Sequence, residues 1–581
     1  MRRRIVETTT AQWTGSYLFR SIACLGVFAS LSISQGAHAQ ITSLSNPSIL
    51  ERALEDPESK GKARSPLLSL PSADELPTDA NDITFELQGL SIKGGETFDV
   101  TTITSLTPPE TGSNISLSDL YAYADRITQY YREAGFALSF ALVPAQEIID
   151  GKVRIEIIEG RIDELIIRDE NLSERTRRHI LDAFARFADK GLTKTHDLEA
   201  FLISINNYPG ITARGVVKPG ETQGSSSLVL EVTQQTQTAT TGYQNYLSDS
   251  LGRDVFLADI ALLGQWTGRD EAKISLRRAP DPKTYRSASF DYNTYIDDSD
   301  LKVFFRASES RTQPEKGALA DLNFSSRSYS QEIGLDLPVW QRRASSMHVG
   351  TILRINNSEA KNGDTPSSLD KVRNITAYAD YEFDVSDGAS HAMRLEIEQG
   401  AKFFQSRANS RQNANLHHTI VRFSERYRHP IQFLDIGQVD ATVRFLAQAT
   451  LSDDPVYANS ECNFGGRGYG IGMDAGTLSG EHCLLTSVQL NWQRPLVGFA
   501  LLPPSLFTLL GRVDAGSVRQ NGPLVAGERR QQEAISAAVG GQFVMASGMT
   551  VNIEQSTQLK NEDNPEKEGE SSTFISVNMR F

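Results

Sequence analysis

The pattern of hydrophobic and polar positions divides the chain near residue 238. From Thr238 to the last residue, apolar and polar side chains alternate with a period of two, which predicts β-strands that have one apolar and one polar face. In the clearest segment, apolar residues from Ile375 to Val385 take the odd positions, and residues such as Asp380 and Glu382 take the even ones. Sixteen strands are predicted, at residues 242–247, 255–265, 272–278, 285–294, 301–309, 329–337, 347–356, 375–385, 391–404, 419–427, 439–451, 484–496, 505–518, 534–545, 550–559 and 573–581.

The connections between these strands favour a membrane β-barrel over a soluble β-sandwich. Long polar connections at 310–328, 357–371, 405–418, 452–483, 519–533 and 560–572 alternate with shorter ones. Short turns on one side, long loops on the other and an even strand number are typical of outer-membrane barrels. Because lipid cannot satisfy backbone polar groups, such a sheet has to close. We therefore predict a membrane β-barrel of about 16 antiparallel strands over residues 236–581.

Residues 83–235 have a different pattern, in which short strands alternate with helices and the order repeats once. A helix is predicted over 117–134, with Leu120, Tyr123, Ile127 and Tyr131 on one face and Gly135 at its end. The second unit has predicted helices at 174–188 and 196–206 and strands at 211–217 and 226–232. We expect two small α+β domains, at 83–160 and 161–235.

The first 82 residues predict a signal peptide followed by a tethered helix. Arg2 to Arg4, an apolar run from Ile22 to Ile33 and Ala37-His38-Ala39 predict a signal peptide at 1–39 that is cut before Gln40. The alternative, an N-terminal membrane anchor, requires a longer apolar run. Within residues 40–82 we expect one helix on a flexible linker. Its apolar positions are Ile49, Leu50, Ala53 and Leu54.

Charge and motif content exclude several function classes. The net charge of −14 makes nucleic acid a poor partner. Of the three cysteines, Cys24 falls in the predicted signal peptide, which leaves Cys462 and Cys483 as one possible pair in an oxidising compartment. Neither a Gly-x-Ser-x-Gly elbow, a His-Glu-x-x-His motif nor a P-loop occurs. We therefore expect no enzyme, no catalytic residue, no cofactor and no metal.

Three blocks of sequence carry a family resemblance over essentially the whole mature chain. The first runs from Val143-Pro144 to Gly160, and the second includes Asn207-Tyr208-Pro209-Gly210. The third pairs Gly465-Gly466-Arg467-Gly468-Tyr469, in the longest loop, with Val513-Asp514-Ala515-Gly516 on a downstream strand. Together the blocks resemble the two-partner secretion transporters that export haemolysins and haemagglutinins, in which two POTRA domains precede a barrel.

The resemblance implies that the long loop folds into the pore and that its arginine meets an aspartate on the wall. Carried onto this chain, the loop-tip residues are Arg467, Gly468, Tyr469, Asp514 and Gly516, with Arg467 paired to Asp514. The chain departs from the family pattern at Gly466, where a branched apolar residue is usual. For the glycine-rich segment alone, a flexible surface loop and a nucleotide-binding loop are the alternatives.

Other features of the chain extend this picture. Cys462 and Cys483 bracket the long loop at facing strand ends, which predicts a disulfide, with two unpaired cysteines as the alternative. Val577, Met579 and the terminal Phe581 share one strand face and look like a signal for the outer-membrane assembly machinery. The resemblance also implies that the helix near Ile49 plugs the resting pore.

The expected function is export of a secreted partner protein across the outer membrane of a Gram-negative bacterium without nucleotide. By resemblance, the partner is a large β-helical toxin or adhesin, recognised by POTRA domains in the periplasm. The other expected partners are membrane lipid and the assembly machinery, and no nucleic acid. One alternative is an insertase that folds other barrels, although insertases usually carry more POTRA domains. The other is a passive porin-like channel or adhesin.

Overall fold

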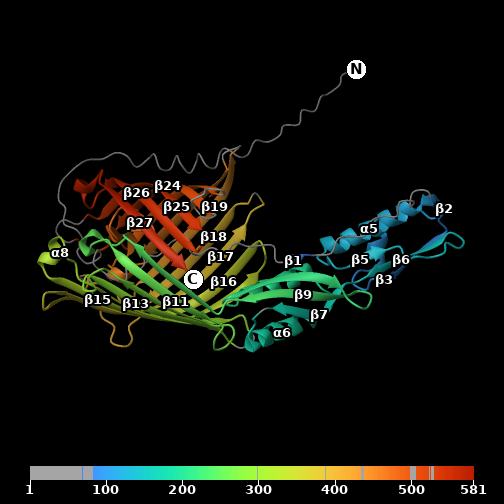
Figure 1. The fold of residues 1–581 in the computed structure, drawn as a ribbon, viewed down its shortest axis with the longest axis horizontal. Helices are drawn as coiled ribbons and strands as arrows, with labels where there is room; N and C mark the ends of the chain where they lie inside the picture. The colour runs from blue at the N-terminus through green and yellow to red at the C-terminus, as the bar shows by residue number, and fades with distance from the viewer. Residues whose placement is uncertain are drawn as a thin grey trace, which may run out of the picture.

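The computed structural model describes residues 83–581 apart from 170, 297–298, 387, 412, 434–436, 497–504, 523 and 525–528, together with the backbone of Leu68–Ser69. The predicted signal peptide and the predicted helix with Ile49, Leu50, Ala53 and Leu54 lie outside the described residues. The described part consists of two α+β domains that extend away from one end of a β-barrel (Figure 1). None of its helices has the length and apolar character needed to cross a membrane.

The first domain packs one long helix against a small sheet. Its elements are β2 (Thr84–Glu86), β3 (Gly89–Gly94), α4 (Val100–Thr104), β4 (Asn114–Ser116), α5 (Leu117–Glu133), β5 (Phe140–Leu142) and β6 (Lys152–Ile158). Strands β3, β6 and β5 form the sheet, and β2 pairs with β4. Helix α5 begins at a capping box, because Ser116 and Asp119 each accept the other's backbone N–H. Tyr123, Ile127 and Tyr131 of its predicted apolar face are fully buried.

The second domain has two helices on a four-stranded sheet. Its elements are β7 (Arg161–Asp169), α6 (Glu174–Ala188), α7 (Thr195–Asn206), β8 (Ile211–Pro219) and β9 (Ser225–Gln234). The sheet order is β1-β8-β9-β7, in which β1 (Leu68–Ser69) pairs in parallel with Gly215 and Val216 of β8. Strand β9 ends at Gln234, and the first barrel strand begins at Gln237. The domain is therefore joined to the barrel wall by a very short segment.

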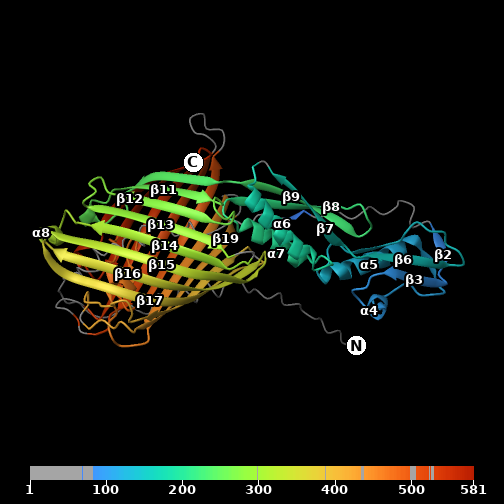
Figure 2. The same ribbon diagram turned by 90° about the horizontal axis from the view of Figure 1, so that it is seen from below.

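Sixteen antiparallel strands form a closed barrel, as predicted (Figure 2). They are β10 (Gln237–Gln244), β11 (Val255–Leu263), β12 (Glu271–Arg278), β13 (Tyr285–Tyr295), β14 (Lys302–Thr312), β15 (Phe324–Gln341), β16 (Ser345–Asn362), β17 (Thr365–Asp384), β18 (Ser390–Gly400), β19 (Thr419–Phe433), β20 (Gly437–Thr450), β23 (His482–Leu496), β24 (Ser505–Arg519), β25 (Gln531–Met545), β26 (Met549–Asn561) and β27 (Ser571–Arg580). The seam between β10 and β27 closes the barrel, with pairs from Thr240↔Arg580 to Gln244↔Ser576. Short helices η2 (Asp249–Leu251), α8 (Ala318–Asp321) and η4 (Pro565–Lys567) lie in the connections.

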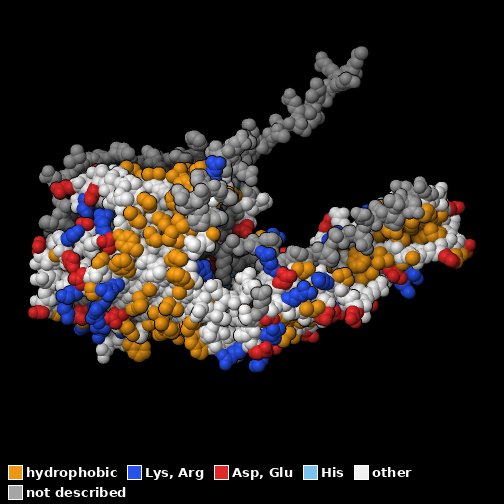
Figure 3. Space-filling model, in the orientation of Figure 1, with side chains coloured by type: hydrophobic (Ala, Val, Ile, Leu, Met, Phe, Trp, Pro, Cys, Tyr) orange, Lys and Arg blue, Asp and Glu red, His pale blue; other side chains and the backbone are white. Residues whose placement is uncertain are grey.

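The two faces of the barrel strands differ as the sequence pattern requires. On β13, Phe290 is 40% exposed, whereas the next residue, Asp291, forms an ion pair with Arg306 on β14. Figure 3 shows hydrophobic side chains covering the middle of the barrel surface, with charged side chains gathered at the end away from the α+β domains. The apolar face is therefore the lipid face and the opposite face lines the lumen.

Two details of the strand prediction are wrong. The predicted connection 357–371 is mostly strand, because β16 and β17 continue to a tight hairpin in which Gly363 has a φ of 57°. Strands that extend beyond the membrane need no apolar face, so the alternation is lost although the ladder continues. The first predicted strand, 242–247, is displaced toward the C-terminus relative to β10, whose Thr, Gly and Ala residues give little alternation.

An arginine placed on the lipid face should destabilise the barrel more than one placed on the adjacent lumen position. We expect Phe290→Arg to cost about 2–4 kcal/mol because the charge would enter hydrocarbon. Ser289→Arg is the matched control, since Ser289 precedes Phe290 on the strand and therefore faces the lumen. Urea unfolding in lipid vesicles measures both, and equal losses of stability would contradict the assignment of faces.

Candidate functional site in the barrel lumen

The connection between β20 and β23, residues 451–481, is folded into the barrel, and we call it the lumen loop. It contains η3 (Ala458–Ser460) and a two-stranded pair, β21 (Cys462–Phe464) with β22 (Leu478–Gly480). Phe464 and Leu478 are fully buried in a cluster with Leu485 and Val518 of the wall. The same cluster includes Ala534 of β25, so the loop packs against strands β23 to β25.

A disulfide ties the base of the lumen loop to the wall. It joins Cys462 of β21 to Cys483 of β23, with 6.1 Å between the two Cα atoms. The cysteines that the sequence analysis paired are thus bonded in the structure, and β21 is held next to the strand that follows the loop.

The tip of the lumen loop is held by two side chains of β24 that grip its backbone. Asp514, which is 0% exposed, accepts the backbone N–H groups of Gly470 and Ile471, each at 2.9 Å. Arg512 donates from Nη1 to the Arg467 carbonyl at 2.8 Å and from Nη2 to the Gly468 carbonyl at 2.7 Å. Residues two apart on a strand share a face, so both side chains reach the lumen together.

Asp514 has a buried arginine partner on its own strand. Its Oδ1 accepts a hydrogen bond from Arg512 Nε at 2.7 Å. Arg512 was missed in the sequence analysis, although its position two residues before Asp514 on an alternating strand was a usable signal. The loop tip meets Asp514 through the backbone N–H groups of Gly470 and Ile471. The pairing of the Arg467 side chain with Asp514 stays a prediction.

The Arg467 side chain contacts an aromatic ring at the seam of the barrel. Its guanidinium is 4.5 Å from the ring centroid of Tyr246, which follows β10. Tyr246 in turn stacks on Phe574 of β27, with centroids 4.8 Å apart and planes 5° apart, and its hydroxyl donates to Glu554 at 2.9 Å. A cation over an aromatic face is stabilising when desolvated. The loop tip therefore contacts residues of the first and last strands together.

The remaining predicted tip residues fit closely around this arrangement. A Cβ on Gly516 would lie 2.4 Å from the ring of Phe464, so only glycine leaves room for that ring. Gly470 has a φ of 85°, which glycine adopts without strain. Tyr469 is partly buried, and the guanidinium of Arg444 lies 5.8 Å from its ring centroid.

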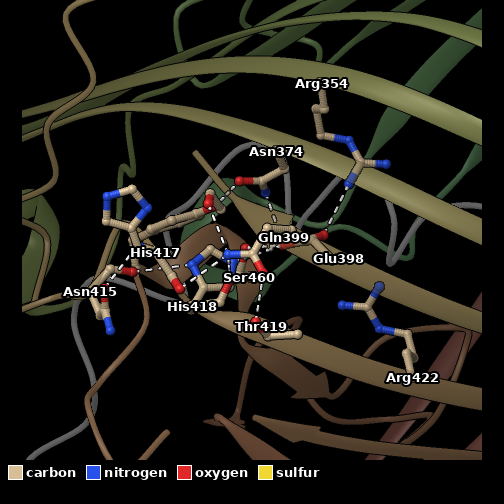
Figure 4. A network of polar contacts seen from close by, with 12 residues as sticks. Arg354, Asn374, Glu398, Gln399, Asn415, His417, His418, Thr419, Arg422 and Ser460 are labelled. Carbon is tan, nitrogen blue, oxygen red and sulfur yellow. Dashed lines mark hydrogen bonds and ion pairs between the residues drawn. The ribbon is translucent and has the colours of Figure 1, made fainter. Parts of the chain in front are cut away.

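A second anchor holds the first part of the lumen loop to another region of the wall (Figure 4). Glu398 on β18 accepts hydrogen bonds from Asn374 on β17 at 2.9 Å and from Ser460 of the loop at 2.7 Å. His418, just before β19, lies 3.2 Å from the same oxygen. Tyr457 of the loop donates to Asn374. Glu398 is also 3.5 Å from Arg354 on β16, so its charge is balanced.

The Glu398 anchor and the contact of Arg467 with Tyr246 lie on opposite sides of the barrel. In the circular strand order, β17 and β18 are the eighth and ninth strands, whereas the seam lies between the sixteenth and the first. The lumen loop therefore crosses the lumen from the Glu398 anchor to the seam. Sequence analysis missed this second anchor, because polar lumen residues are expected on every strand and nothing in the sequence links these particular ones.

The described residues offer no candidate metal centre. Among the described residues, no cluster of three or more His, Cys, Asp or Glu side chains is placed to hold a metal ion.

The chain has two small α+β domains followed by a closed barrel with a loop folded into its lumen. This arrangement defines an outer-membrane β-barrel protein with POTRA domains. The chain matches the ShlB-type POTRA domain over residues 85–160 and the haemolysin secretion/activation protein ShlB/FhaC/HecB over residues 224–543. Since the second match spans more than half of the chain, the protein belongs to this haemolysin secretion/activation family. The predicted family, fold class and outer-membrane location, with POTRA domains in the periplasm, are confirmed.

Curated relatives and solved structures agree with this assignment. The chain is 28% identical over 191 residues to the heme/hemopexin transporter protein HuxB of Haemophilus influenzae, a match that covers 32% of this chain and 33% of HuxB. The chain thus matches about a third of the length of these relatives. CdiB from Escherichia coli has a TM-score of 0.68 at 15% identity, over 92% of this chain and 95% of CdiB. CdiB from Acinetobacter baumannii has a TM-score of 0.59 at 14% identity, over 91% and 95%. At these identities the structural likeness shows the fold alone.

Replacing Asp514 by asparagine should free the loop tip. The change keeps the side-chain size but removes the charge that pairs with Arg512, and breaking a buried ion pair costs about 3–5 kcal/mol. A spin label on Gly468→Cys reports the tip, because a Cβ there has no neighbour within 4 Å. We expect the label to become mobile. Asp454→Asn is the control, since Asp454 bonds the exposed side chain of Asn415. An equally immobile label in both variants would disprove the grip.

Proposed function

We propose that this protein is an outer-membrane pore that recognises an unfolded secreted partner through its POTRA domains and exports it without nucleotide. The observation that carries the proposal is the lumen loop, which crosses a closed barrel and is held by contacts that can be broken and remade. Because the wall is closed by its own hydrogen bonds, a polypeptide can pass only through the lumen. The loop inside the lumen would therefore have to move aside during export. The short link from β9 to β10 places the second POTRA domain at the periplasmic opening.

The lumen wall supports passage of a hydrophilic chain. Charged residues alternate in sign across successive strands, and each has a partner on a nearby strand. Arg306 contacts Asp291 and lies 3.1 Å from Glu332, which lies 2.6 Å from Arg354. The ladder continues from Arg354 to Glu398 at 3.5 Å. Because these charges balance one another, the lumen wall is hydrophilic but does not strongly attract either positively or negatively charged segments of a polypeptide.

The second POTRA sheet supports recognition of an extended partner. Its β8 edge already takes an added parallel strand, β1, at Gly215 and Val216. An unpaired sheet edge binds an extended segment through backbone hydrogen bonds, largely independent of its sequence. We infer that a segment of the partner adds to a POTRA edge in the same manner.

The identity of the partners is part of the proposal. We infer a large β-helical toxin or adhesin as the exported client, and the name of the HuxB relatives adds heme and hemopexin handling to the roles such a client could have. The assembly machinery would read the last strand, where Val577, Met579 and Phe581 alternate toward lipid and Phe581 is exposed. The helix near Ile49 would be the plug of the resting pore.

Two alternative functions keep the architecture. An insertase would change the amounts of other outer-membrane barrels when it is depleted, whereas an exporter would change the secretion of one client. A passive channel would conduct ions but would not release a protein. Co-expression with the product of the adjacent reading frame separates the three, because only the exporter places that product in the medium.

Export should collapse in Arg467→Ala and Asp514→Ala while the barrel still assembles. The first variant removes the contact at Tyr246 and the second removes the grip on the backbone of Gly470 and Ile471, so the loop loses its defined resting position. Secreted client is measured in the medium, and barrel assembly by heat-modifiable migration. Arg327→Ala is the control, because it removes an exposed arginine paired with Glu309 outside the lumen. Unchanged secretion in both variants would refute the role of the loop tip.

A further inference from the structure

A fully buried arginine lies in a periplasmic turn, where side chains are usually exposed. Arg269 is in the turn between β11 and β12 and is only 2% exposed. Burying a guanidinium costs free energy unless it is paired and bonded. Its surroundings therefore have to offset that cost.

Arg269 contacts tyrosines of two different domains. Its guanidinium carbon is 4.5 Å from the ring centroid of Tyr208, at the end of α7 in the second POTRA domain. It is also 4.5 Å from the ring of Tyr295, at the periplasmic end of β13. Nη2 donates to the Ser299 carbonyl at 3.1 Å, and Asp300 is 3.7 Å away. The two ring centroids are 6.4 Å apart, so the tyrosines flank the guanidinium at an angle. A flat, delocalised cation packs on aromatic faces in a way that the compact ammonium of lysine does not.

The turn around Arg269 is shaped to receive the POTRA domain. Asp270, which is fully buried, accepts the backbone N–H groups of Thr267 and Gly268 and so fixes the turn from inside. The turn's carbonyl groups point outward and accept bonds from α6. Arg175 donates to the carbonyls of Gln265 and Trp266, Thr176 donates to that of Gly268, and His179 lies 2.9 Å from that of Thr267.

Two further contacts broaden the junction. The Asn207 side chain donates to Gln341 at the end of β15 at 3.1 Å, and the Tyr295 hydroxyl donates to the Asn207 carbonyl at 3.4 Å. The second POTRA domain therefore touches the ends of β13 and β15 and the β11–β12 turn, besides continuing directly into β10. Domains joined by one linker are expected to move relative to each other. Contacts at separate points around Arg269 remove that freedom.

We propose that Arg269 is a positioning residue that fixes the second POTRA domain on the periplasmic rim, so that this domain and the barrel move as one body. The fixed angle holds open a cleft of about 550 Å³ between the domain and the seam strands, lined by residues that include Tyr208, Gly210, Thr238, Leu263 and Arg580. The cleft is at the barrel-proximal end of β8, the edge that accepts an extra strand. This second step, delivery of the client past a fixed POTRA domain, rests on the proposed export function.

The test measures the angle and the export separately. Spin labels on Ala185→Cys of α6 and Ala344→Cys of the β15–β16 turn, both exposed alanines, report the distance between domain and barrel in the full chain in lipid. The described native cysteines are in a disulfide and stay unlabelled. In this labelled background we compare Arg269→Ala, Arg269→Lys and, as a control, Arg342→Ala, which removes an exposed arginine from another periplasmic turn.

We expect a single narrow distance in the parent and in Arg342→Ala, and a broad distribution in Arg269→Ala. Arg269→Lys should restore part of the order. Client export should fall about tenfold in Arg269→Ala, as losing about 1.4 kcal/mol of positioning free energy predicts, with partial recovery in the lysine variant and equal barrel amounts throughout. Should Arg269→Ala fail to assemble, Tyr295→Leu removes one ring face and serves as the second variant.

The two measurements fail independently. A distribution in Arg269→Ala as narrow as in the parent overturns the positioning role. A broadened distribution with unchanged export overturns its importance for delivery. If the parent itself exports no client, the proposed function fails, and the distance measurement still decides whether Arg269 fixes the domain.

Discussion

Backbone hydrogen bonding in lipid is the constraint on which the rest of this structure depends. Hydrocarbon offers no partner to an N–H or a carbonyl, so each of the sixteen strands has to pair on both sides and the first strand has to meet the last. Closure then separates the side chains into a lipid face and a lumen face. The lumen face is free to carry charge, and the ladder from Asp291 to Glu398 uses that freedom.

A closed wall of this size encloses a lumen, and the lumen loop is folded into it. The loop has a small apolar core against β23 to β25 and polar anchors elsewhere. Its anchors lie on opposite sides, at β17 and β18 and at the β10–β27 seam. The ring stack of Tyr246 and Phe574 makes the seam itself part of one anchor. The closure of the wall and the obstruction of the lumen are therefore physically connected.

The sequence predicts the fold well, because the alternation that marks a strand is local and most strands pair with their neighbours in the chain. It predicts the site less well. The sixteen strands follow from alternation, except that β10 alternates weakly and was displaced, and that β16 and β17 continue beyond their alternating segments. The tip residues were found by resemblance, but Arg512, which bonds Asp514 and the backbone of the tip, was not found. Glu398, Asn374 and Ser460 come from three distant segments, and their meeting depends on how the loop folds. Arg269 is equally hidden, since a charged residue in a short turn ordinarily indicates exposure.

The positions of the contacts limit where the described residues can move during the proposed export. The wall is closed and the second POTRA domain contacts its rim around Arg269, whereas the lumen loop is held by a disulfide and by contacts that can break. Within that loop, the disulfide at Cys462 lies between the Tyr457 and Ser460 segment and the Arg467 tip. Each segment can therefore leave its anchor while the base stays on β23. The hydrogen bonds that Asp514 and Arg512 make to the tip all use the loop backbone, so they can form again whenever the tip returns to β24.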